Sequence, residues 1–391
     1  MAWPPDEPKL DRVRALMAED DLDALVVRAP DNLLYLTGYW CMKGYDIAIF
    51  PREGDPTLVV IEPQRGDAER TAWTGDIRLF AGYDAADPRP PAVRALDVAL
   101  KAVRERGLAG RVGIELTQGA QAADRMVGEP TVFTHPFFDA FDEAVADVVD
   151  ASTLLARARA IKTEQELERM RLANELAALG VEHVRDLVRP GMKESEVAAL
   201  FEGHVHALGV GFQGKVEMAR AFTLVWSGPG IATFTATADR PVVEGEPTLM
   251  EIWVCADGYW TDLTKNLCPG ALKPEYRELL EALLAIFERG VSHCRPGESM
   301  AELDRTMRAD IAAAGYPGQP SHAVAHGVGA RAHEPPWPHQ ADGGTLAAGM
   351  VLAIEPGVYW PGGGGLRLED NFLVTDSGPE KLCRIPEDFR R

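Results

Sequence analysis

Three glutamates lie inside apolar segments typical of β-strands, and this feature restricts the fold of the chain most strongly. Glu251 sits in PTLMEIWV, Glu355 in VLAIEPGVY and Glu369 in LRLEDNFLV. A carboxylate buried in such a segment costs several kcal/mol unless it is paired with a positive charge or bound to a metal ion. The three glutamates together therefore need a shared explanation.

A divalent metal site is the economical explanation, because carboxylate oxygens and an imidazole suit Mn, Fe, Co or Zn. Asp262 follows Glu251 by eleven positions, a spacing that fits two antiparallel strands joined by a turn near Asp257 and Gly258. The alternative is a set of independent buried ion pairs with the nearby basic residues Arg240, Lys265 and Arg367. Composition alone does not decide between the two.

Length and charge limit the kind of protein. A chain of 391 residues is long enough for two or three domains. Its net charge of -20 argues against a nucleic-acid or anionic membrane surface as partner, so we expect a small molecule or a peptide. The first residues have no signal-peptide pattern, and no stretch approaches the roughly 18 apolar residues of a membrane helix. We therefore predict a cytoplasmic protein.

The order of strand and helix patterns predicts an α+β chain of two domains. Residues 1–152 alternate helices with strands, with a first strand at 24–28 and a turn at 30–32. Thr163 and Glu166 have the spacing of a capping box, and the helix that they begin ends before Arg189-Pro190-Gly191. The second domain, 153–391, continues mainly as strands interrupted by two helices.

Several motifs, in order, resemble the creatinase / Xaa-Pro aminopeptidase / prolidase family, which are M24-like metallopeptidases with the pita-bread fold. They are NLLYLTGYW, AIKTEQELERMRLAN, VRPGMKESEV, WSGPG, EIWVCADGYWTDLTKN, HAVAHGVGARAHEPP, AIEPGVY and LRLEDNFLVT. The resemblance implies a creatinase-like α/β domain over 1–152. It also implies a catalytic domain over 153–391, with a curved, mostly antiparallel sheet flanked by helices, and a homodimer.

The resemblance also implies roles for single residues. One or two divalent ions would be held by Glu251, Asp262, His326, Glu355 and Glu369. Glu355 would in addition act as general base toward a metal-activated water. His333 would steady the oxyanion, His322 would lie on the substrate side, and Arg367 would orient a carboxylate ligand.

Several positions depart from the family pattern, and two of them bear most directly on function. Glu251 stands where the family has an aspartate, and Thr235 stands where its peptidases carry a substrate-handling histidine. Several tryptophans accompany the site motifs, which suggests an aromatic-walled pocket for a compact apolar, aromatic or cationic substrate. These are Trp226, Trp253, Trp260, Trp337 and Trp360.

Three functional hypotheses follow. The first is a metal-dependent hydrolase, aminopeptidase- or dipeptidase-like, that cleaves the C–N bond of a peptide or small amide. The second is a relative that acts on a small molecule by creatinase-like metal-free hydrolysis or by lyase chemistry, favoured by Glu251 and Thr235. The third is a binding protein that kept the fold and lost catalysis.

Overall fold

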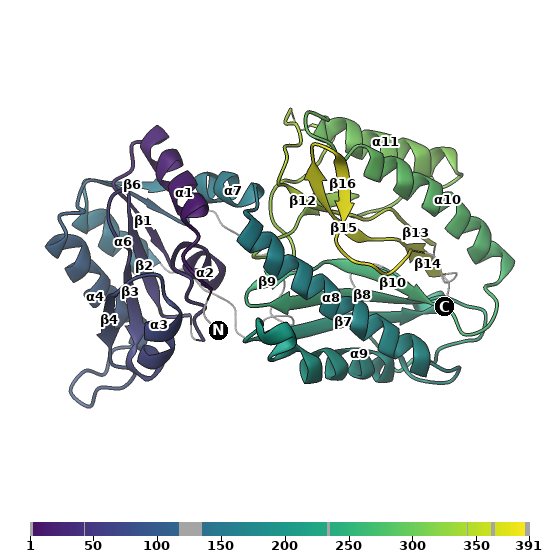
Figure 1. Cartoon of the computed structure of the whole chain (residues 1–391), viewed down its shortest axis with the longest axis horizontal. Coiled ribbons are helices and arrows are strands. Elements are labelled where there is room, and N and C mark those ends of the chain that lie inside the picture. Colours follow the sequence, from purple (N-terminus) through teal and green to yellow (C-terminus); the bar gives the residue numbers. More distant parts are fainter. Residues whose placement is uncertain are drawn as a thin grey trace. The chain divides into compact units, whose positions relative to one another are not determined.

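The computed structural model describes residues 3–42, 44–116, 135–232, 235–341, 343–360 and 364–387. These residues form two compact units, which divide between Arg159 and Ala160. Each unit combines helices with β-sheet (Figure 1), so the predicted α+β class is confirmed. α7 (Ser152–Ala160), which begins at the expected domain boundary, lies almost wholly in the first unit.

The first unit is built on a six-stranded mixed sheet with the strand order β4-β3-β2-β1-β5-β6. β1 pairs with β2, and β2 with β3, in antiparallel fashion. The other neighbouring pairs, β3–β4, β1–β5 and β5–β6, run parallel. Its strands are β1 (Ala24–Val27), β2 (Ile47–Pro51), β3 (Thr57–Ile61), β4 (Asp76–Phe80), β5 (Arg111–Ile114) and β6 (Asp147–Asp150). β1 and β2 are buried along their whole length, and β5 along all but its first residue, because helices cover both faces of the sheet.

Two apolar clusters lie on opposite faces of this sheet. One unites Val13, Leu33 and Leu155 of three helices with the strands, and the other unites Ala99 and Phe141 with them. The helices of this unit are α1 (Glu7–Glu19), α2 (Pro30–Thr37), α3 (Arg65–Thr71), α4 (Pro91–Glu105), α6 (His135–Ala144) and α7, with a 3₁₀ turn η1 (Glu62–Gln64).

The turn predicted at residues 30–32 is wrong, because α2 begins there. Pro30 occupies the first helical turn, where its missing N–H costs nothing, and Gly38 ends the helix with a left-handed φ of 73°. Glu115 accepts hydrogen bonds from the backbone N–H groups of Arg28 and Ala29, which precede the helix. A residue distant in sequence thus stabilises the start of α2.

The second unit opens with two helices on a four-stranded antiparallel sheet. α8 (Glu164–Leu187) begins with the predicted capping box of Thr163 and Glu166, and α9 (Glu194–Gly209) follows it. The sheet has the order β10-β8-β7, with β9 paired to β8. Its strands are β7 (Ala219–Ser227), β8 (Thr248–Ala256), β9 (Tyr259–Trp260) and β10 (Leu263–Leu267), and the 3₁₀ turns η2 (Phe212–Gly214) and η3 (Gly228–Gly230) flank β7.

The rest of this unit is a second antiparallel sheet covered by two helices. The sheet has the order β11-β12-β15-β16, and β13 and β14 form a separate hairpin. The elements are α10 (Pro274–Ser292), α11 (Met300–Ala313), β11 (Ala325–Gly327), β12 (Val351–Ile354), β13 (Gly357–Trp360), β14 (Gly364–Arg367), β15 (Asp370–Thr375) and β16 (Gly378–Lys381). Leu283, Leu303 and Phe372 belong to the apolar cluster that binds helices to sheet.

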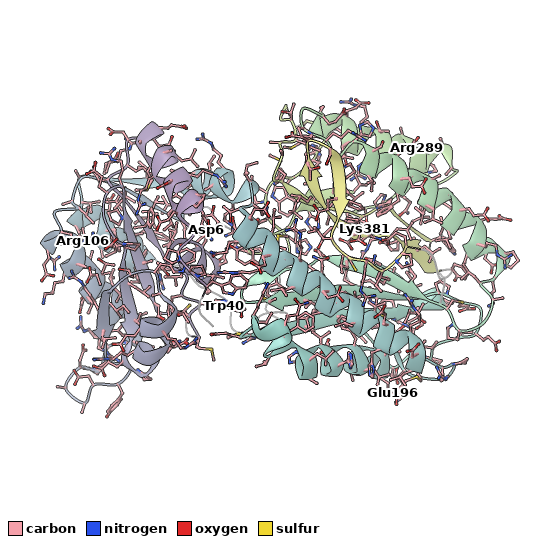
Figure 2. All side chains as sticks on the ribbon, viewed as in Figure 1. Asp6, Trp40, Arg106, Glu196, Arg289 and Lys381 are labelled. Atoms are coloured by element: carbon pink, nitrogen blue, oxygen red, sulfur yellow. The ribbon has the colours of Figure 1, made fainter. Side chains whose placement is uncertain are left out.

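Charged side chains of the second unit pair on the outer faces of these helices. Arg289 of α10, which is labelled in Figure 2, is an example, and its Nε lies 2.6 Å from Oδ2 of Asp310 in α11. Across the part of the chain that is described, no helix combines the length and apolar character that crossing a membrane requires.

An isolated bridge joins the two sheets of the second unit. Thr264 of β10 pairs in antiparallel fashion with Glu369, the residue before β15. Glu251 of β8 lies directly opposite Thr264 in the first sheet. Carboxylates from both sheets therefore approach one another at this bridge.

Candidate active site

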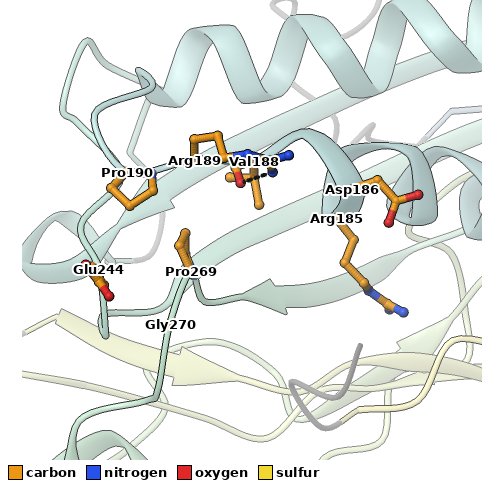
Figure 3. Close-up of a pocket in the computed structure, with 8 residues that line it drawn as sticks. All are labelled: Arg185, Asp186, Val188, Arg189, Pro190, Glu244, Pro269 and Gly270. Atoms are coloured by element: carbon orange, nitrogen blue, oxygen red, sulfur yellow. Dashed lines mark hydrogen bonds between the residues drawn. The ribbon is translucent and has the colours of Figure 1, made fainter.

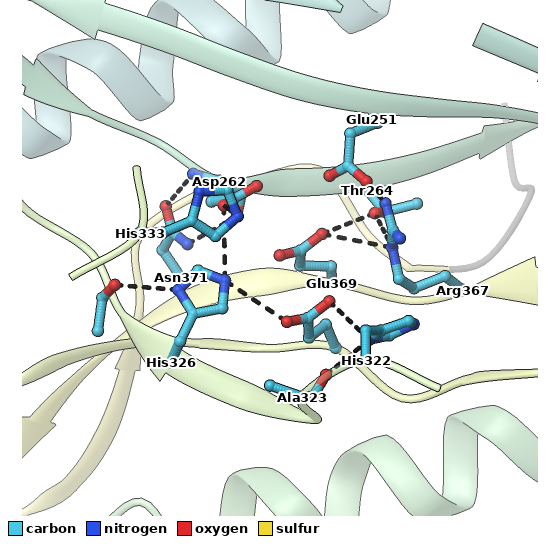
Figure 4. A network of polar contacts seen from close by, with 12 residues as sticks. Glu251, Asp262, Thr264, His322, Ala323, His326, His333, Arg367, Glu369 and Asn371 are labelled. Atoms are coloured by element: carbon cyan, nitrogen blue, oxygen red, sulfur yellow. Dashed lines mark hydrogen bonds and ion pairs between the residues drawn. The ribbon is translucent and has the colours of Figure 1, made fainter. Parts of the chain in front are cut away.

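The five predicted metal ligands come together where the two sheets of the second unit meet (Figure 4). Each lies in or beside a strand, and each is at most 8 % exposed. Within the described residues, three groups of acids and histidines have ligand atoms within 4.8 Å of one another: Asp262, His326 and His333; His326, Glu355 and Glu369; and Glu251, Asp262 and Glu369. The predicted hairpin, with antiparallel strands around Asp257 and Gly258, is confirmed by the β8–β10 pairing.

Asp262 stands out because its carboxylate is buried among other titratable groups. It is 1 % exposed, His333 Nε2 lies 3.2 Å from its Oδ2, and the Trp253 indole is close by, but neither side-chain oxygen has a well-formed hydrogen bond within the described residues. Its backbone, in contrast, is held on both sides by the Asn371 amide. A buried acceptor of this kind is costly unless a cation or donor reaches it.

His326 presents its second ring nitrogen to the acids. Its Nδ1 lies 3.0 Å from the Gly327 carbonyl, so that nitrogen carries the proton. Its Nε2 lies 3.5 Å from both Asp262 Oδ2 and Glu355 Oε1. Burial lowers the pKa of His326 to about 4, which keeps the imidazole neutral and its Nε2 lone pair free for a metal.

The acids of the group repel one another. Burial, followed by the charges of Glu369 and Glu355, raises the pKa of Asp262 well above its ordinary value, although the nearby Trp253 indole opposes this. Burial and then the charge of Glu369 raise the pKa of Glu355 in the same way. A divalent ion among these groups would remove the repulsion that raises both pKa values.

Glu251 differs from the other acids because it already has a cationic partner. Its Oε2 forms an ion pair with Nη2 of Arg367, and both side chains are buried. Arg367 donates from Nε to Thr264 Oγ1 at 2.7 Å and from Nη1 to the Tyr359 hydroxyl at 3.2 Å. Arg367 thus contacts Glu251, one of the predicted metal ligands.

The two other predicted histidines flank the acids. His333 Nε2 lies 3.2 Å from Asp262 Oδ2, and burial followed by the neighbouring His326 lowers the pKa of His333 to about 3. His322 Nδ1 lies 3.2 Å from Glu355 Oε2, and its Nε2 is 3.0 Å from the Tyr359 hydroxyl. The side chain of His333 is 23 % exposed, and the side chain of His322 is 9 % exposed.

The predicted aromatic residues do not all lie at the acids. Trp253 contacts the site, since its ring lies 6.3 Å from His333 and stacks on Phe222 at 5.6 Å. Trp337 lies 5.6 Å from His326. Trp226 instead belongs to a separate buried cluster with Ile231 and Leu249.

Among the described residues, no hydrogen bond or ring contact joins Trp260 or Thr235, two of the predicted substrate-side residues, to the acids. Trp260 lies on β9, where its backbone N–H donates to the Gly329 carbonyl. Thr235 is exposed in the segment between β7 and β8. Of the predicted aromatic residues, Trp253 and Trp337 therefore lie at the site, whereas Trp226 and Trp260 have no described contact with it.

Sequence reasoning did not single out Thr264, Tyr359 and Asn371 as site residues. Thr264 donates to Glu369 Oε2 at 2.7 Å, and Tyr359 bridges His322 and Arg367. All three fall inside motifs that carry the family resemblance, and the structure places Thr264 opposite Glu251 in the predicted hairpin. Their hydrogen bonds join residues that are distant in sequence, so no local sequence pattern indicates these contacts.

A separate open pocket of about 450 Å³ lies elsewhere in the second unit (Figure 3). It is lined by Arg185, Asp186, Val188, Arg189, Pro190, Glu244, Pro269 and Gly270. Most of these residues are exposed, and none of them belongs to the acid and histidine groups. This pocket has no buried polar group that would define a ligand.

A two-domain α+β chain that buries four carboxylates beside histidines has the construction of a metallohydrolase. Residues 168–376, more than half of the chain, match the model of metallopeptidase family M24, and residues 9–161 match that of the creatinase/prolidase N-terminal domain. The chain therefore belongs to metallopeptidase family M24.

Relatives match along nearly the whole length of the chain. It is 25% identical to the Xaa-Pro dipeptidase of Pyrococcus furiosus over 97% of this chain and 99% of that protein. The structure of the prolidase from Pyrococcus horikoshii matches with a TM-score of 0.80 and 25% identity over 98% of this chain and 100% of that chain. An Xaa-Pro dipeptidase from Bacillus anthracis has the same fold, with a TM-score of 0.80, 24% identity and 98% of each chain covered.

Family membership confirms the predicted class, fold and enzyme type. The chain is a hydrolase of the metallopeptidase kind with the pita-bread fold. The creatinase-like metal-free or lyase alternative is not favoured, because the relatives are dipeptidases and prolidases. The acid and histidine groups are of a kind that could hold a metal ion.

Proposed function

We propose that this chain hydrolyses the peptide bond of a dipeptide with the help of one or two divalent ions of Mn, Fe, Co or Zn. The proposed ligands are Glu251, Asp262, His326, Glu355 and Glu369. The observation that carries the proposal is the buried cluster of these side chains, in which His326 Nε2 lies 3.5 Å from both Asp262 Oδ2 and Glu355 Oε1. Carboxylate oxygens with one imidazole are the donors that such ions prefer. The substrate class rests on the relatives, which are Xaa-Pro dipeptidases and prolidases.

Glu355 is the proposed general base. When bound, the ion lowers the pKa of a water and polarises a carbonyl group. Glu355 accepts a proton from the attacking water as the new C–O bond forms, and it delivers that proton to the leaving nitrogen as the C–N bond breaks. His322 lies 3.2 Å from Glu355 Oε2, and this contact orients the carboxylate for the transfer.

His333 is the proposed donor to the substrate oxygen. Because its pKa is lowered to about 3 by burial and by His326, it is neutral at pH 7 and carries a single N–H. Its Nε2 lies on the side of the acids, 3.2 Å from Asp262 Oδ2, so this nitrogen is the proposed donor to the substrate oxygen once an ion binds Asp262. A neutral donor beside a developing oxyanion stabilises the transition state more than the ground state.

Trp253 and Trp337 are the proposed walls of the substrate site, since both lie against its histidines. Trp226, Trp260 and Thr235 are proposed to act on the substrate only indirectly, because no described contact joins them to the acids. Arg367 is proposed to orient Glu251 and, at 3.6 Å, Glu369.

Turnover of a dipeptide panel by the metal-loaded protein tests the function. The panel should include Xaa-Pro and Xaa-Ala dipeptides, with release of the free amino acid as readout. We expect Glu355→Gln to lower kcat by about two to four orders of magnitude, the usual contribution of a general base. Its circular dichroism and Tm should remain close to those of the unchanged protein. Full activity in the folded variant would contradict the role of Glu355.

We also propose a homodimer in the cytoplasm. The five cysteines form no disulfide, and four of them are buried, which suits a reducing compartment. Light scattering coupled to gel filtration should give twice the chain mass of 42.6 kDa. A single-chain mass at micromolar concentration would reject the dimer.

A further inference from the structure

We propose that Glu387 is a positioning residue for the candidate active site: it holds Lys265, and Lys265 holds the backbone that carries Glu369. The inference rests on the proposed function, because it takes Glu369 as a ligand of a divalent ion. Glu387 lies beyond residue 376, where the match to the metallopeptidase model ends. The inference therefore adds a residue from the segment after β16, residues 382–387, to the groups on which metal binding depends.

Two consecutive residues of β10 act on opposite sides of Glu369. Thr264 donates to the Glu369 carboxylate, with its Oγ1 2.7 Å from Oε2. Lys265 points to the other face of the strand, because successive side chains of a strand alternate. There its Nζ lies 3.3 Å from the Glu369 carbonyl oxygen and 2.7 Å from Asp370 Oδ2. Lys265 thus fixes the peptide between Glu369 and Asp370, while the Glu369 carboxylate faces the other acids.

Lys265 depends on carboxylates because it is buried. Its side chain is 2% exposed, and the side chains of Asp370 and Glu387 are 0% and 7% exposed. Glu387 Oε1 lies 2.7 Å from Lys265 Nζ, on the lysine that Asp370 also contacts. A buried ammonium group is stable only where carboxylates and other acceptors surround it. Glu387 therefore limits where the Lys265 ammonium group can lie.

The segment after β16 is anchored so that Glu387 reaches Lys265. Its side chains Cys383 and Ile385 are buried. Lys381, the last residue of β16 and labelled in Figure 2, donates from Nζ to the Ile385 carbonyl and to Glu387 Oε1, both at 2.7 Å. The second lysine thus turns the chain back and places the Glu387 carboxylate between two ammonium groups.

A role in stability alone would make Glu387 equivalent to the carboxylate of any buried ion pair. Arg159 and Asp31 form such a pair within the first unit, with side chains 5% and 13% exposed. The difference is that Lys265 contacts the backbone of Glu369, whereas Arg159 contacts Asp31 and Asn32. The two pairs therefore allow an effect on metal binding to be separated from an effect on stability.

Metal titration of the full chain tests the inference. The protein is stripped with a chelator and titrated with MnCl₂ by calorimetry, and EPR records the spectrum of the bound ion. The titration is made at about pH 8, because burial raises the pKa of Glu387 to about 7 and the side chain has to be ionised.

We expect Glu387→Gln to weaken Mn binding by about tenfold and Lys265→Met by about 10- to 100-fold, the usual effect of losing a residue that orients a ligand. The EPR spectrum of the bound ion should change in both variants. Arg159→Met is the matched control, which should lower the Tm and leave the dissociation constant and the spectrum unchanged. Glu387→Gln keeps the shape of the side chain and carries the test if Lys265→Met does not fold.

The double variant shows whether Glu387 acts through Lys265. Lys265→Met combined with Glu387→Gln should bind Mn about as weakly as Lys265→Met alone, because Glu387 then has no Lys265 ammonium group to hold. Two effects that multiply would overturn the inference, because Glu387 would act on metal binding by a separate route.

The outcomes separate this inference from the function on which it rests. Mn binding that is the same in the unchanged protein, Glu387→Gln and Lys265→Met would overturn the inference and leave the proposed hydrolase intact. Equal weakening in Arg159→Met would also overturn it, because the effect would then follow stability alone. An unchanged protein that binds neither Mn nor, in the same titration, Co or Zn would overturn the proposed function together with the inference.

Discussion

Asn371 holds the peptide of Asp262 from both sides. Its Oδ1 accepts from the Asp262 backbone N–H at 3.1 Å, and its Nδ2 donates to the Asp262 carbonyl at 2.7 Å. Asn371 is fully buried and follows Glu369 by two residues. The two hydrogen bonds therefore connect the segments that carry two of the proposed ligands, Asp262 and Glu369, in the two sheets.

We expect Asn371→Ala to weaken the binding of Mn by about 10- to 100-fold, the usual effect of losing a residue that orients a ligand. Stability should fall by about 1–3 kcal/mol, because buried backbone groups lose their partners. Calorimetric titration and urea unfolding measure the two effects. Asn174→Ala is the matched control, since Asn174 is buried and donates to Met170 within α8. It should lower stability without changing Mn affinity; equal Mn affinity in both variants would contradict the role of Asn371.

The metal-free protein should lose stability as pH rises. Burial and neighbouring charges raise the pKa of Asp262 well above its ordinary value of 3.8. A carboxyl with a higher pKa in the folded state binds more protons there than in the unfolded chain. Its stabilising contribution is complete below the unfolded pKa and is lost as pH rises toward the folded pKa.

Asp262→Asn removes this titration, so we expect the chelated variant to gain stability over the unchanged protein as pH rises from about 5 to about 8. The slope should approach about 1.4 kcal/mol per pH unit in the steepest part. Comparing the two proteins at each pH removes the contribution of the histidines, whose lowered pKa values act in the opposite direction. Urea unfolding at each pH provides the measurement. A difference that does not change with pH would show that Asp262 titrates normally.

Trp253 and Trp226 offer a matched pair of variants. Both indoles are buried, but only Trp253 lies against His333 and close to Asp262. Trp226→Phe removes a donor that has no partner among the described residues, so it should cost little stability through hydrogen bonding.

We expect Trp253→Ala to raise KM for dipeptides by roughly tenfold, equivalent to about 1.4 kcal/mol, because a wall of the site is lost. Trp253→Phe should retain most of the wall and give a smaller change, and Trp226→Phe should leave KM unchanged. Steady-state kinetics over the dipeptide panel give these values. Similar KM changes for both Phe variants would mean that they act through general packing.

Lys162 and Glu334 form a buried ion pair beside the site, with Nζ and Oε1 3.0 Å apart and side chains 1% and 2% exposed. Lys162→Met should cost about 3–5 kcal/mol, because the Glu334 carboxylate is left buried without its cation. Adding Glu334→Leu should recover part of that loss. A double-mutant cycle by urea unfolding measures the coupling.

The exposed pair of Lys215 and Glu168 is the control, with side chains 48% and 42% exposed. Lys215→Met should cost less than about 1 kcal/mol, since water screens an exposed pair. A loss of similar size at both lysines would contradict the importance of burial for the Lys162 pair.

The predictions that succeeded depend on contacts between residues close in sequence. Thr163 and Glu166 form a capping box within one helical turn, and Glu251 and Asp262 lie on a hairpin whose turn has positive φ angles at Asp257 and Gly258. The turn predicted at 30–32 failed for the opposite reason. Glu115, far along the chain, accepts from the backbone before α2, and no local pattern reports such a contact.

The sequence by itself determined the family, the two-domain α+β class and the set of acids and histidines, because motif order and strand periodicity are local properties of the chain. Only the tertiary structure decided which of those groups is paired. The bond between Thr264 and Glu369 spans 105 positions, and that between Asn371 and Asp262 spans 109. The pairing of Glu251 with Arg367 also joins two strands distant in sequence. Such contacts depend on how separate sheets pack, so no local pattern in the sequence could indicate them.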